Sequence, residues 1–297
     1  MTAHAAPLLP LLTHGLGLAD AAPRGAALRA SLAFVGVLEN DAARRPFLPL
    51  FPLVLAALQR ALNENEEADA AEILEALVSL AAEAPVFFRD AMAPLGDAML
   101  AVASAPALEF GTRARAVELL LTLAERAPAL VRRHKALVER LVPVVFEMMC
   151  AAEDDAAWAR GAYVEGIDDD EDFRLGEEAL ERMMTTLAAT ALPTALTLAS
   201  QALGQTGSWS RQRAALAALA RIADGNPKAF RPQVVAVVPA LVQVLQAAAA
   251  ADGAGGVAQH PRVAFEALQA SCAVARVCGS PTPVQWASHH RLAGPPV

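Results

Sequence analysis

The sequence has few cysteines, few aromatic residues and little charge. Its 297 residues include three cysteines, 5% aromatic and 19% charged residues, with a net charge of −8. Cys150, Cys272 and Cys278 show no paired spacing, which indicates free thiols in a reducing compartment. The negative balance repels phosphate, and no Lys/Arg stripe is interleaved with aromatic residues. We therefore exclude nucleic acid as a partner and expect a basic one.

Catalytic and metal-binding motifs are also missing. The sequence contains no Gly-rich phosphate loop followed by Lys-Ser/Thr, no His-Glu-x-x-His and no Cys-x-x-Cys. The acidic segment described below lacks the spaced Asp/Asn pattern and the glycine of an EF-hand loop. Cys150 follows Met148 and Met149, which favours a packing role over a nucleophile. We therefore predict no enzyme, no catalytic residues, no cofactor and no metal site.

Two uncharged runs, residues 183–210 and 234–251, are long enough to be considered as membrane spans. Pro193 interrupts the first and Pro239 the second, and the first is rich in Thr and Ser. A span requires about 20 predominantly apolar residues. We expect no membrane span and interpret both runs as buried helices of an all-α core, consistent with the high Ala and Leu content.

Three segments of the chain resemble one another. They read "LVSLAAEAPVFFR" from Leu77, "LLTLAERAPALVR" from Leu120 and "LARIADGNPKAFR" from Leu219. Each is a run of helical period that ends at a proline, followed by apolar positions and an arginine. The first two prolines are 43 residues apart and the third follows after 99, which leaves room for two repeats and an insertion. A weaker copy begins at Leu32.

This spacing predicts a repeat of two helices. Proline cannot continue a helix and shifts the preceding residue out of the α region, so the first helix ends there. A repeat of about 40 to 47 residues is typical of HEAT and armadillo proteins. We predict an all-α, right-handed HEAT-repeat solenoid of antiparallel helix pairs, with about 6 repeats. An ordinary helical bundle is the alternative.

The boundaries expected from this pattern divide the chain into three parts. Residues 1–30 form a partial first repeat or a disordered N-terminus, and residues 31–275 form the solenoid, with an acidic loop at 153–176. Residues 276–297 are Pro/Gly-rich and form a disordered tail.

The acidic segment, Glu153–Glu178, carries most of the charge asymmetry. Eleven acidic residues against two arginines give it a net charge of −9, so the rest of the chain sums to about +1. It lies between a helix expected to end near Cys150 and one expected to start near Glu177. Acidic residues with interleaved aromatics suit a basic peptide through electrostatic and cation–π contacts. A solubilising insertion without a partner remains the alternative.

The stretch "LVPVVFEMMCAAEDDAAWARGAYVEGIDDDEDFRLGEEALERM", Leu141–Met183, resembles the acidic-loop repeat of importin-beta nuclear transport receptors, the importin-five or beta-three type above all. "GSWSRQRAALAALARIADG" from Gly207 is similar to the start of the next HEAT repeat. "HPRVAFEAL" from His260 and "LLLTLAERAPALVRR" from Leu119 extend the likeness over residues 30 to 275.

The resemblance implies a carrier that shuttles between cytoplasm and nucleus, through the nuclear envelope. Such a carrier binds basic cargo with nuclear localisation signals, such as ribosomal proteins, releases it to Ran-GTP and contacts nucleoporin FG repeats. Carried over by position, the candidate cargo or Ran contacts are Asp154, Asp155, Trp158, Glu165, Asp168, Asp169, Asp170, Glu171, Asp172, Phe173, Trp209, Arg211 and Arg213. For the last three, packing between repeats is the alternative role.

Family members are roughly three times longer, and their N-terminal repeats, which make the main Ran-GTP contacts, have no counterpart in this sequence. We therefore expect a central segment of a receptor with a weak or absent Ran contact. A HEAT scaffold of another kind and an inactive truncated fragment remain as alternative functions.

Overall fold

The computed structural model describes residues 5–151, 171–205, 207–251 and 260–279. Every regular element within these ranges is a helix, so the all-α prediction is confirmed. The chain divides into two compact units. Unit 1 comprises residues 1–145 and 189–194, and unit 2 comprises residues 146–188 and 195–297.

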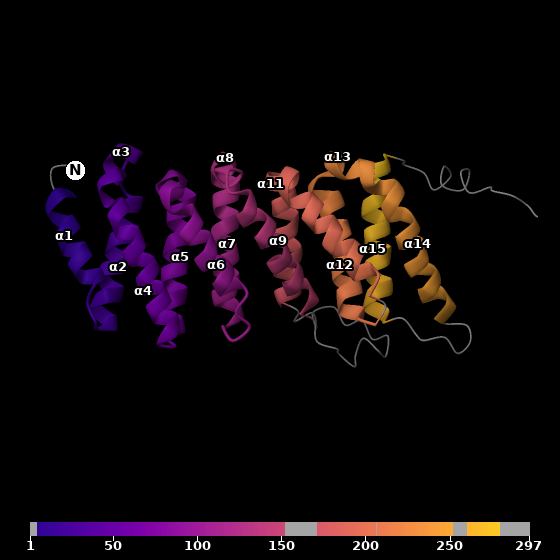
Figure 1. Cartoon of the computed structure of the whole chain (residues 1–297), viewed down its shortest axis with the longest axis horizontal. Coiled ribbons are helices and arrows are strands. Elements are labelled where there is room, and N and C mark those ends of the chain that lie inside the picture. Colours follow the sequence, from indigo (N-terminus) through magenta and orange to yellow (C-terminus); the bar gives the residue numbers. More distant parts are fainter. Residues whose placement is uncertain (1–4, 152–170, 206, 252–259, 280–297) are drawn as a thin grey trace, which may run out of the picture. The chain divides into compact units, whose positions relative to one another are not determined.

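Unit 1 is a stack of helix pairs. Its first helices, α2, α5 and α7, pack against one another in order, and the second helices α4 and α6 each pack against the next first helix (Figure 1). The elements are α1 (Ala5–Leu16), α2 (Ala21–Gly36), α3 (Asp41–Arg44), η2 (Arg45–Leu50), α4 (Phe51–Asn63), α5 (Glu67–Glu83), η3 (Pro85–Ala91), α6 (Met92–Ala103), α7 (Phe110–Arg126), α8 (Pro128–Val131) and the start of α9 (Lys135–Cys150).

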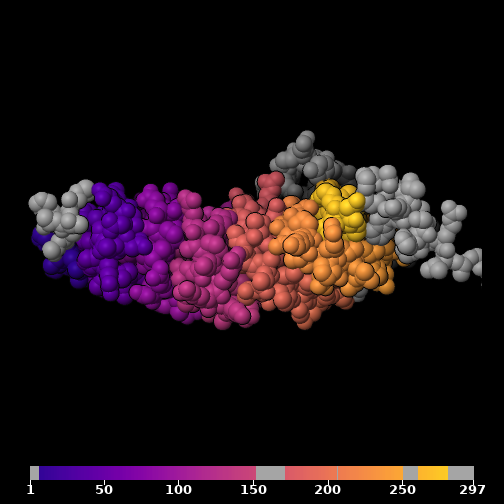
Figure 2. Space-filling model, turned by 90° about the horizontal axis from the view of Figure 1, so that it is seen from above, coloured from indigo at the N-terminus to yellow at the C-terminus, as the bar shows by residue number. Residues whose placement is uncertain are grey.

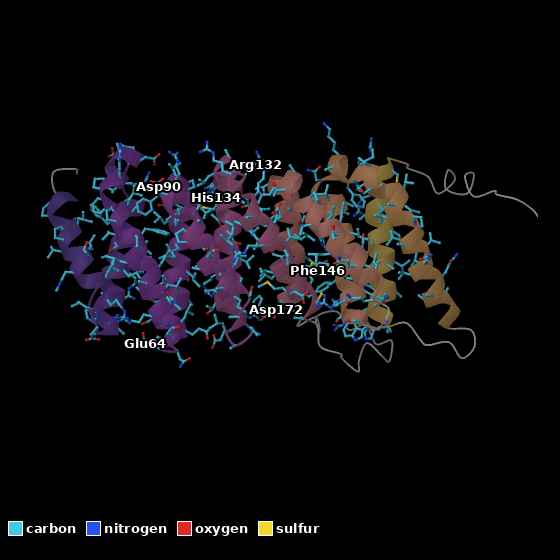
Figure 3. All side chains as sticks on the ribbon, viewed as in Figure 1. Glu64, Asp90, Arg132, His134, Phe146 and Asp172 are labelled. Atoms are coloured by element: carbon cyan, nitrogen blue, oxygen red, sulfur yellow. The ribbon has the colours of Figure 1, made fainter. Side chains whose placement is uncertain are left out.

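The connections of unit 1 lie at two opposite edges. Asp90 in η3 marks the turn within one helix pair, and Arg132 and His134 mark the turn within the next (Figure 3). Glu64, after α4, lies at the other edge, where one pair connects to the following pair. This alternation is the helix–turn–helix arrangement that HEAT repeats use to bury their faces by stacking.

Unit 2 repeats this arrangement with longer helices. Helix α11 (Glu171–Leu203) contains a break at Leu187, where φ −125° and ψ 15° leave the helical region, so it consists of two helices joined by a kink. Four further helices and a 3₁₀ turn follow it: α12 (Trp209–Gly225), α13 (Pro227–Phe230), η4 (Arg231–Gln233), α14 (Val234–Ala251) and α15 (Pro261–Cys278). The first helices α12 and α15 pack side by side, and α14 packs on α15.

The proline at the end of each repeated segment ends a first helix, as predicted. The preceding residues share one conformation: Ala84 has φ −135° and ψ 56°, Ala127 has φ −137° and ψ 60°, and Asn226 has φ −150° and ψ 75°. The clash between proline and its predecessor explains why all three leave the α region. The apolar side chains three residues after the prolines are buried in the core: Phe88, Val131 and Phe230.

Arginine–carboxylate pairs connect neighbouring repeats at the repeat distance. Arg29 donates to Glu72 at 2.8 Å, 43 residues away, and Arg221 Nε donates to Glu177 at 3.1 Å, 44 residues away. Residues one repeat apart face each other because equivalent helices stack. Together with the proline turns, these pairs confirm the HEAT-repeat solenoid and argue against an ordinary bundle.

Two helix boundaries differ from the sequence-based expectations. Helix α11 starts at Glu171 rather than near Glu177, so residues 171–176 are helical and not part of a loop. Acidic residues are favourable in this first turn because they complement the positive end of the helix dipole. Helix α15 continues to Cys278 rather than ending at 275. Helices α1 and α2 occupy most of residues 1–30, as a partial first repeat would.

Helix α14 is the main departure in packing. We expected a helix buried between neighbours, but Val235 is 84% exposed and Val242 is 41% exposed. The space-filling view shows this helix, coloured orange, at the surface of unit 2 (Figure 2). Its apolar composition predicted burial; no described element covers its outer side.

Three helical segments are long and apolar enough to cross a membrane: Asp41–Asn63, Glu171–Leu203 and Pro227–Ala249. The second and third overlap the two uncharged runs noted in the sequence. Helix α4, within the first segment, buries Phe51, Val54 and Leu58 against the rest of unit 1. The expectation of no membrane span stays a prediction.

Candidate functional site

The acidic segment reaches the described part of the chain at the start of α11. Glu171 is exposed and Asp172 is half-buried, and Asp172 lies at the N-terminal end of the helix (Figure 3). The other acidic and aromatic candidates lie outside the described residues: Asp154, Asp155, Trp158, Glu165, Asp168, Asp169 and Asp170.

Phe173 fixes the start of α11 to α12. Its side chain is 2% exposed, and the guanidinium carbon of Arg213 lies 3.6 Å from the centre of its ring. A buried cation–π contact of this kind contributes about 2 kcal/mol when the cation is desolvated. Phe173 is therefore a core residue, and its predicted contact with cargo does not fit this burial.

Arg213 also meets a buried carboxylate from α15. Its Nε lies 3.6 Å from Oε1 of Glu266, and both side chains are almost completely buried. Burial raises the pKa of Glu266 to about 7, the nearby charge of Glu177 adds to this, and Arg213 opposes it. The carboxyl of Glu266 thus holds its proton up to the neutral range.

Arg221, two turns further along α12, binds two carboxylates of α11. It donates from Nε to Glu177 at 3.1 Å and from Nη1 to Glu181 at 3.3 Å. Together with Phe173, Arg213 and Glu266, these residues form a cluster contributed by α11, α12 and α15, in which Arg213 and Glu266 are buried and Arg221 and Glu181 are half-buried. It holds the helix that follows the acidic segment in a defined orientation.

Trp209 stacks on a histidine at the start of α15. The Trp209 and His260 rings lie 4.0 Å apart with an interplanar angle of 13°, and the guanidinium of Arg262 lies 5.9 Å from the indole. His260 caps α15, its Nδ1 accepting from the backbone N–H of Arg262 at 3.3 Å. This contact joins the first turns of α12 and α15.

Arg211 pairs with the end of α9. Its Nη2 donates to both carboxylate oxygens of Glu147 at 2.9 Å. Nearby, burial raises the pKa of the Cys150 thiol to about 12, and Glu147 adds to the increase. The thiol is therefore protonated at neutral pH and a poor nucleophile, as a packing role requires.

The structure brings Trp209, Arg211 and Arg213 together on the first turns of α12. Trp209 contacts the start of α15, Arg211 contacts α9 and Arg213 contacts both α11 and α15. Their geometry therefore favours the packing role that the sequence left open. Sequence reasoning missed the partners Glu147, His260 and Glu266. Arg221 and its acids are separated by 44 and 40 residues, so a search for opposite charges one repeat apart would have found that pair.

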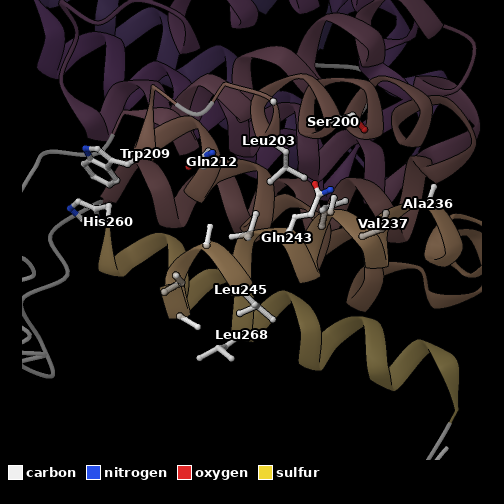
Figure 4. Close-up of a pocket in the computed structure, with 18 of the residues that line it drawn as sticks. Ser200, Leu203, Trp209, Gln212, Ala236, Val237, Gln243, Leu245, His260 and Leu268 are labelled. Atoms are coloured by element: carbon white, nitrogen blue, oxygen red, sulfur yellow. The ribbon is translucent and has the colours of Figure 1, made fainter. Parts of the chain in front are cut away.

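An open apolar groove lies elsewhere in unit 2. Its volume is about 1460 Å³, and it is lined by α12, α14, the second half of α11 and the start of α15 (Figure 4). Leu203, Val237, Leu245 and Leu268 line its sides, and Trp209 and His260 lie at one end. Its lining, all of it from described residues, includes no Asp, Glu, Lys or Arg. Within the described residues, no cluster of three or more His, Cys, Asp or Glu is arranged to hold a metal.

Part of the chain is similar to known proteins. Residues 106–194 match the family described as "Importin repeat", a match that includes the whole acidic segment. Importin subunit beta-3 of Saccharomyces cerevisiae is 29% identical over 182 residues, which are 59% of this chain and 16% of that protein.

Solved structures of the karyopherin Kap121p share the fold. The structure with the extreme C-terminus of the protein phosphatase Cdc14p has a TM-score of 0.82 at 21% identity, and the structure with the SUMO protease Ulp1p has a TM-score of 0.82 at 23% identity. Each match covers 97% of this chain and 27% of the other. The chain thus spans about a quarter of the length of these structures. Residues 106–194 of this chain thus match an importin repeat, part of the chain is similar to importin subunit beta-3, and its fold is the HEAT-repeat fold of the Kap121p structures.

Proposed function

We propose that this chain is a segment of a nuclear import receptor and contributes a surface that binds basic cargo. The observation that carries the proposal is the overlap of the importin repeat, residues 106–194, with the acidic segment. A net charge of −9 within 26 residues attracts a lysine-rich peptide over long range and accelerates its association.

Related structures support a role in binding protein segments. Kap121p has been solved bound to Ste12p, Pho4p and Nup53p, among others. By analogy, basic nuclear proteins are the cargo we propose for this chain, with nucleoporin FG repeats as further partners. Release by Ran-GTP and shuttling between cytoplasm and nucleus complete the proposal.

The described residues suggest how the surface is supported. Phe173 and Arg213 fix the start of α11, and Glu177 binds Arg221. The acidic segment is therefore joined to an ordered helix, and Glu171 remains exposed there. In this arrangement Arg211 and Arg213 position helices and do not contact cargo themselves.

Binding of a fluorescent lysine-rich peptide to the purified chain tests the proposal. Anisotropy would be measured over a salt series for the native chain and for a variant with Asp168, Asp169, Asp170 and Asp172 changed to Asn and Glu171 to Gln. We expect at least tenfold weaker binding and a smaller salt slope for the variant, because five charges are lost. The control neutralises five exposed carboxylates of unit 1 instead: Glu39, Glu83, Asp90, Glu109 and Glu139.

The outcomes separate the alternative functions. Equal losses in the two variants would mean that net charge alone attracts the peptide. Binding unaffected by either variant would make the acidic segment a solubilising insertion. A folded chain that binds no basic peptide would instead favour a HEAT scaffold of another kind or an inactive fragment.

A further inference from the structure

The turn between α7 and α9 carries the densest group of positive charge in unit 1. Arg126 ends α7, and Arg132, Arg133 and Lys135 follow the short helix α8. All four side chains are exposed, and no Asp or Glu lies between residues 126 and 138. We call these four residues the basic turn.

Backbone hydrogen bonds and buried side chains hold the basic turn in place. The N–H of Arg132 donates to the carbonyl of Pro128 at 2.9 Å. The N–H of Arg133 donates to the carbonyl of Leu130 at 3.2 Å. The side chains of Leu130 and Val131 are buried, and Arg132 lies at the outer edge of the unit (Figure 3). Because this backbone is already ordered, a ligand that binds here pays little for ordering it.

The cations of the basic turn differ from the others of unit 1 in their partners. Among the described residues, Arg126, Arg133 and Lys135 form no ion pair and no side-chain hydrogen bond. The nearest carboxylates in the sequence, Glu125 and Glu139, lie outside the turn at its two ends. Other cations of the unit each bind a carboxylate: Arg24, Arg29, Arg44, Arg115 and Arg140.

The composition of the basic turn indicates the class of ligand. Three of its four cations are arginines, whose planar guanidinium groups match carboxylates through two parallel hydrogen bonds. Tight binding to duplex DNA uses roughly 6–10 phosphate contacts, whereas the turn offers four cations on a chain with a net charge of −8. Anchoring in a membrane surface also requires apolar side chains that insert, and Leu130 and Val131 are buried. A short acidic peptide is the ligand that fits best.

We propose that the basic turn binds an acidic segment of a partner protein, with its guanidinium and ammonium groups on neighbouring carboxylates. The adjacent turn carries Arg89 together with the exposed Glu83 and Asp90, so the positive surface ends there and accepts a short run of acids. The site shares no residue with the acidic segment and attracts the opposite charge. The chain thereby recognises a basic cargo and an acidic partner through different residues.

The two lysines of the chain allow a direct test. Lys135 belongs to the basic turn, and Lys228 in α13 is also exposed but lies in unit 2. A carbodiimide joins carboxylates to amines that they contact, so the full chain is treated with it in the presence of N-acetylated octaglutamate. Mass spectrometry then identifies the modified lysines. We expect at least tenfold more crosslink at Lys135 than at Lys228; equal yields, or none at either lysine, would overturn the proposal.

A matched pair of variants tests the arginines as well. In each variant three cations of unit 1 become Gln, so the net charge changes equally. The first variant combines Arg126→Gln, Arg133→Gln and Lys135→Gln. The control combines Arg29→Gln, Arg60→Gln and Arg115→Gln, which lie outside the basic turn. By fluorescence anisotropy, we expect octaglutamate to bind the first variant at least tenfold more weakly, with a smaller salt slope, and the control nearly as tightly as the native chain.

The remaining outcomes separate other ligands and the proposed cargo site. Equal losses in the two variants would mean that overall charge attracts the peptide, and tighter binding of a single-stranded oligonucleotide than of octaglutamate would indicate a nucleic-acid surface. Either result would overturn the proposal. The variant with a neutralised acidic segment should bind octaglutamate at least as tightly as the native chain, so a failure of cargo binding and a failure of the basic turn can be told apart. Circular dichroism checks that all variants fold.

Discussion

Helices α6 and α14 are both the second helices of their repeats, and both are apolar, yet they are packed differently. In α6, Met92, Leu95 and Met99 are at most 1% exposed, whereas Leu241 is the buried residue among the described side chains of α14. The difference shows that apolar composition predicts a helix but not its burial. Burial of a helix depends on whether other elements of the fold pack against it.

Truncating one apolar side chain in each helix tests this contrast most strongly. Leu95→Ala should lower the free energy of unfolding by about 2–5 kcal/mol, because it leaves a cavity in a closed core. Val235→Ala, at a position 84% exposed, should change it by less than about 0.5 kcal/mol. Urea unfolding followed by circular dichroism measures both, and similar losses would contradict the difference in packing.

The two units also differ in how they bury charge. In unit 1 the buried Arg24 pairs with Glu64 and Glu66, which reach solvent, whereas in unit 2 both Arg213 and Glu266 are buried. The pKa of Glu266 is raised from 4.5 to about 7, so the folded chain keeps a proton that the unfolded chain loses above pH 4.5. Its contribution to stability is therefore present below about pH 4.5 and is lost as the pH rises through 7.

Glu266→Gln should remove this pH dependence. We expect the unfolding free energy of unit 2 to fall by roughly 3 kcal/mol between pH 5 and pH 8 in the native chain, relative to the variant. Glu72→Gln, which alters an exposed pair of unit 1, should retain the native slope. Urea titrations at several pH values measure this, and parallel curves for native chain and Glu266→Gln would show that Glu266 titrates normally.

Two glycines, one in each unit, differ in the atoms that an added Cβ would meet. A Cβ at Gly225 would lie 2.8 Å from the carbonyl oxygen of Glu181 and 2.9 Å from Cβ of Met184, whereas one at Gly96 would meet the flexible end of Leu137. Gly225→Ala should therefore destabilise unit 2 by about 1–3 kcal/mol. Gly96→Ala should lower the free energy of unfolding by less, because the Leu137 side chain can move and alanine has a higher helix propensity than glycine.

Thermal unfolding of the two variants, with Gly207→Ala as a control that has nothing within 4 Å of its added Cβ, measures these effects. A larger loss for Gly96→Ala than for Gly225→Ala would show that the Leu137 side chain is less adaptable than the backbone of α11.

Surface ion pairs should contribute least. Arg276 binds both oxygens of the partly buried Asp224 at 2.9 Å, whereas Arg29 and Glu72 are both exposed. Substituting either arginine by Gln should lower the free energy of unfolding by no more than about 1 kcal/mol, and the loss should be larger for Arg276 than for Arg29. The loss should shrink in 1 M salt for Arg29→Gln; a salt-independent loss would point to packing by the side chain's methylene groups.

The sequence predicted the features that depend on local chemistry. The prolines at 85, 128 and 227 ended helices because ring geometry acts on the adjacent residue. The exposure of α14 and the burial of Phe173 depend on contacts with distant residues, which no local pattern contains. Likewise, Trp209 and Arg213 were candidate site residues, but the sequence did not reveal that His260 and Glu266 are their partners.

The shared conformation of Ala84, Ala127 and Asn226 has a consequence for how such chains grow and can be re-engineered. The stretch from Pro85 to Ala127 begins after one of these joints and ends at the next, with nearly identical dihedral angles at both. A gene duplication of this cassette would insert a whole repeat and leave each junction unchanged. The same joints are therefore suitable cut points for exchanging repeats between related proteins.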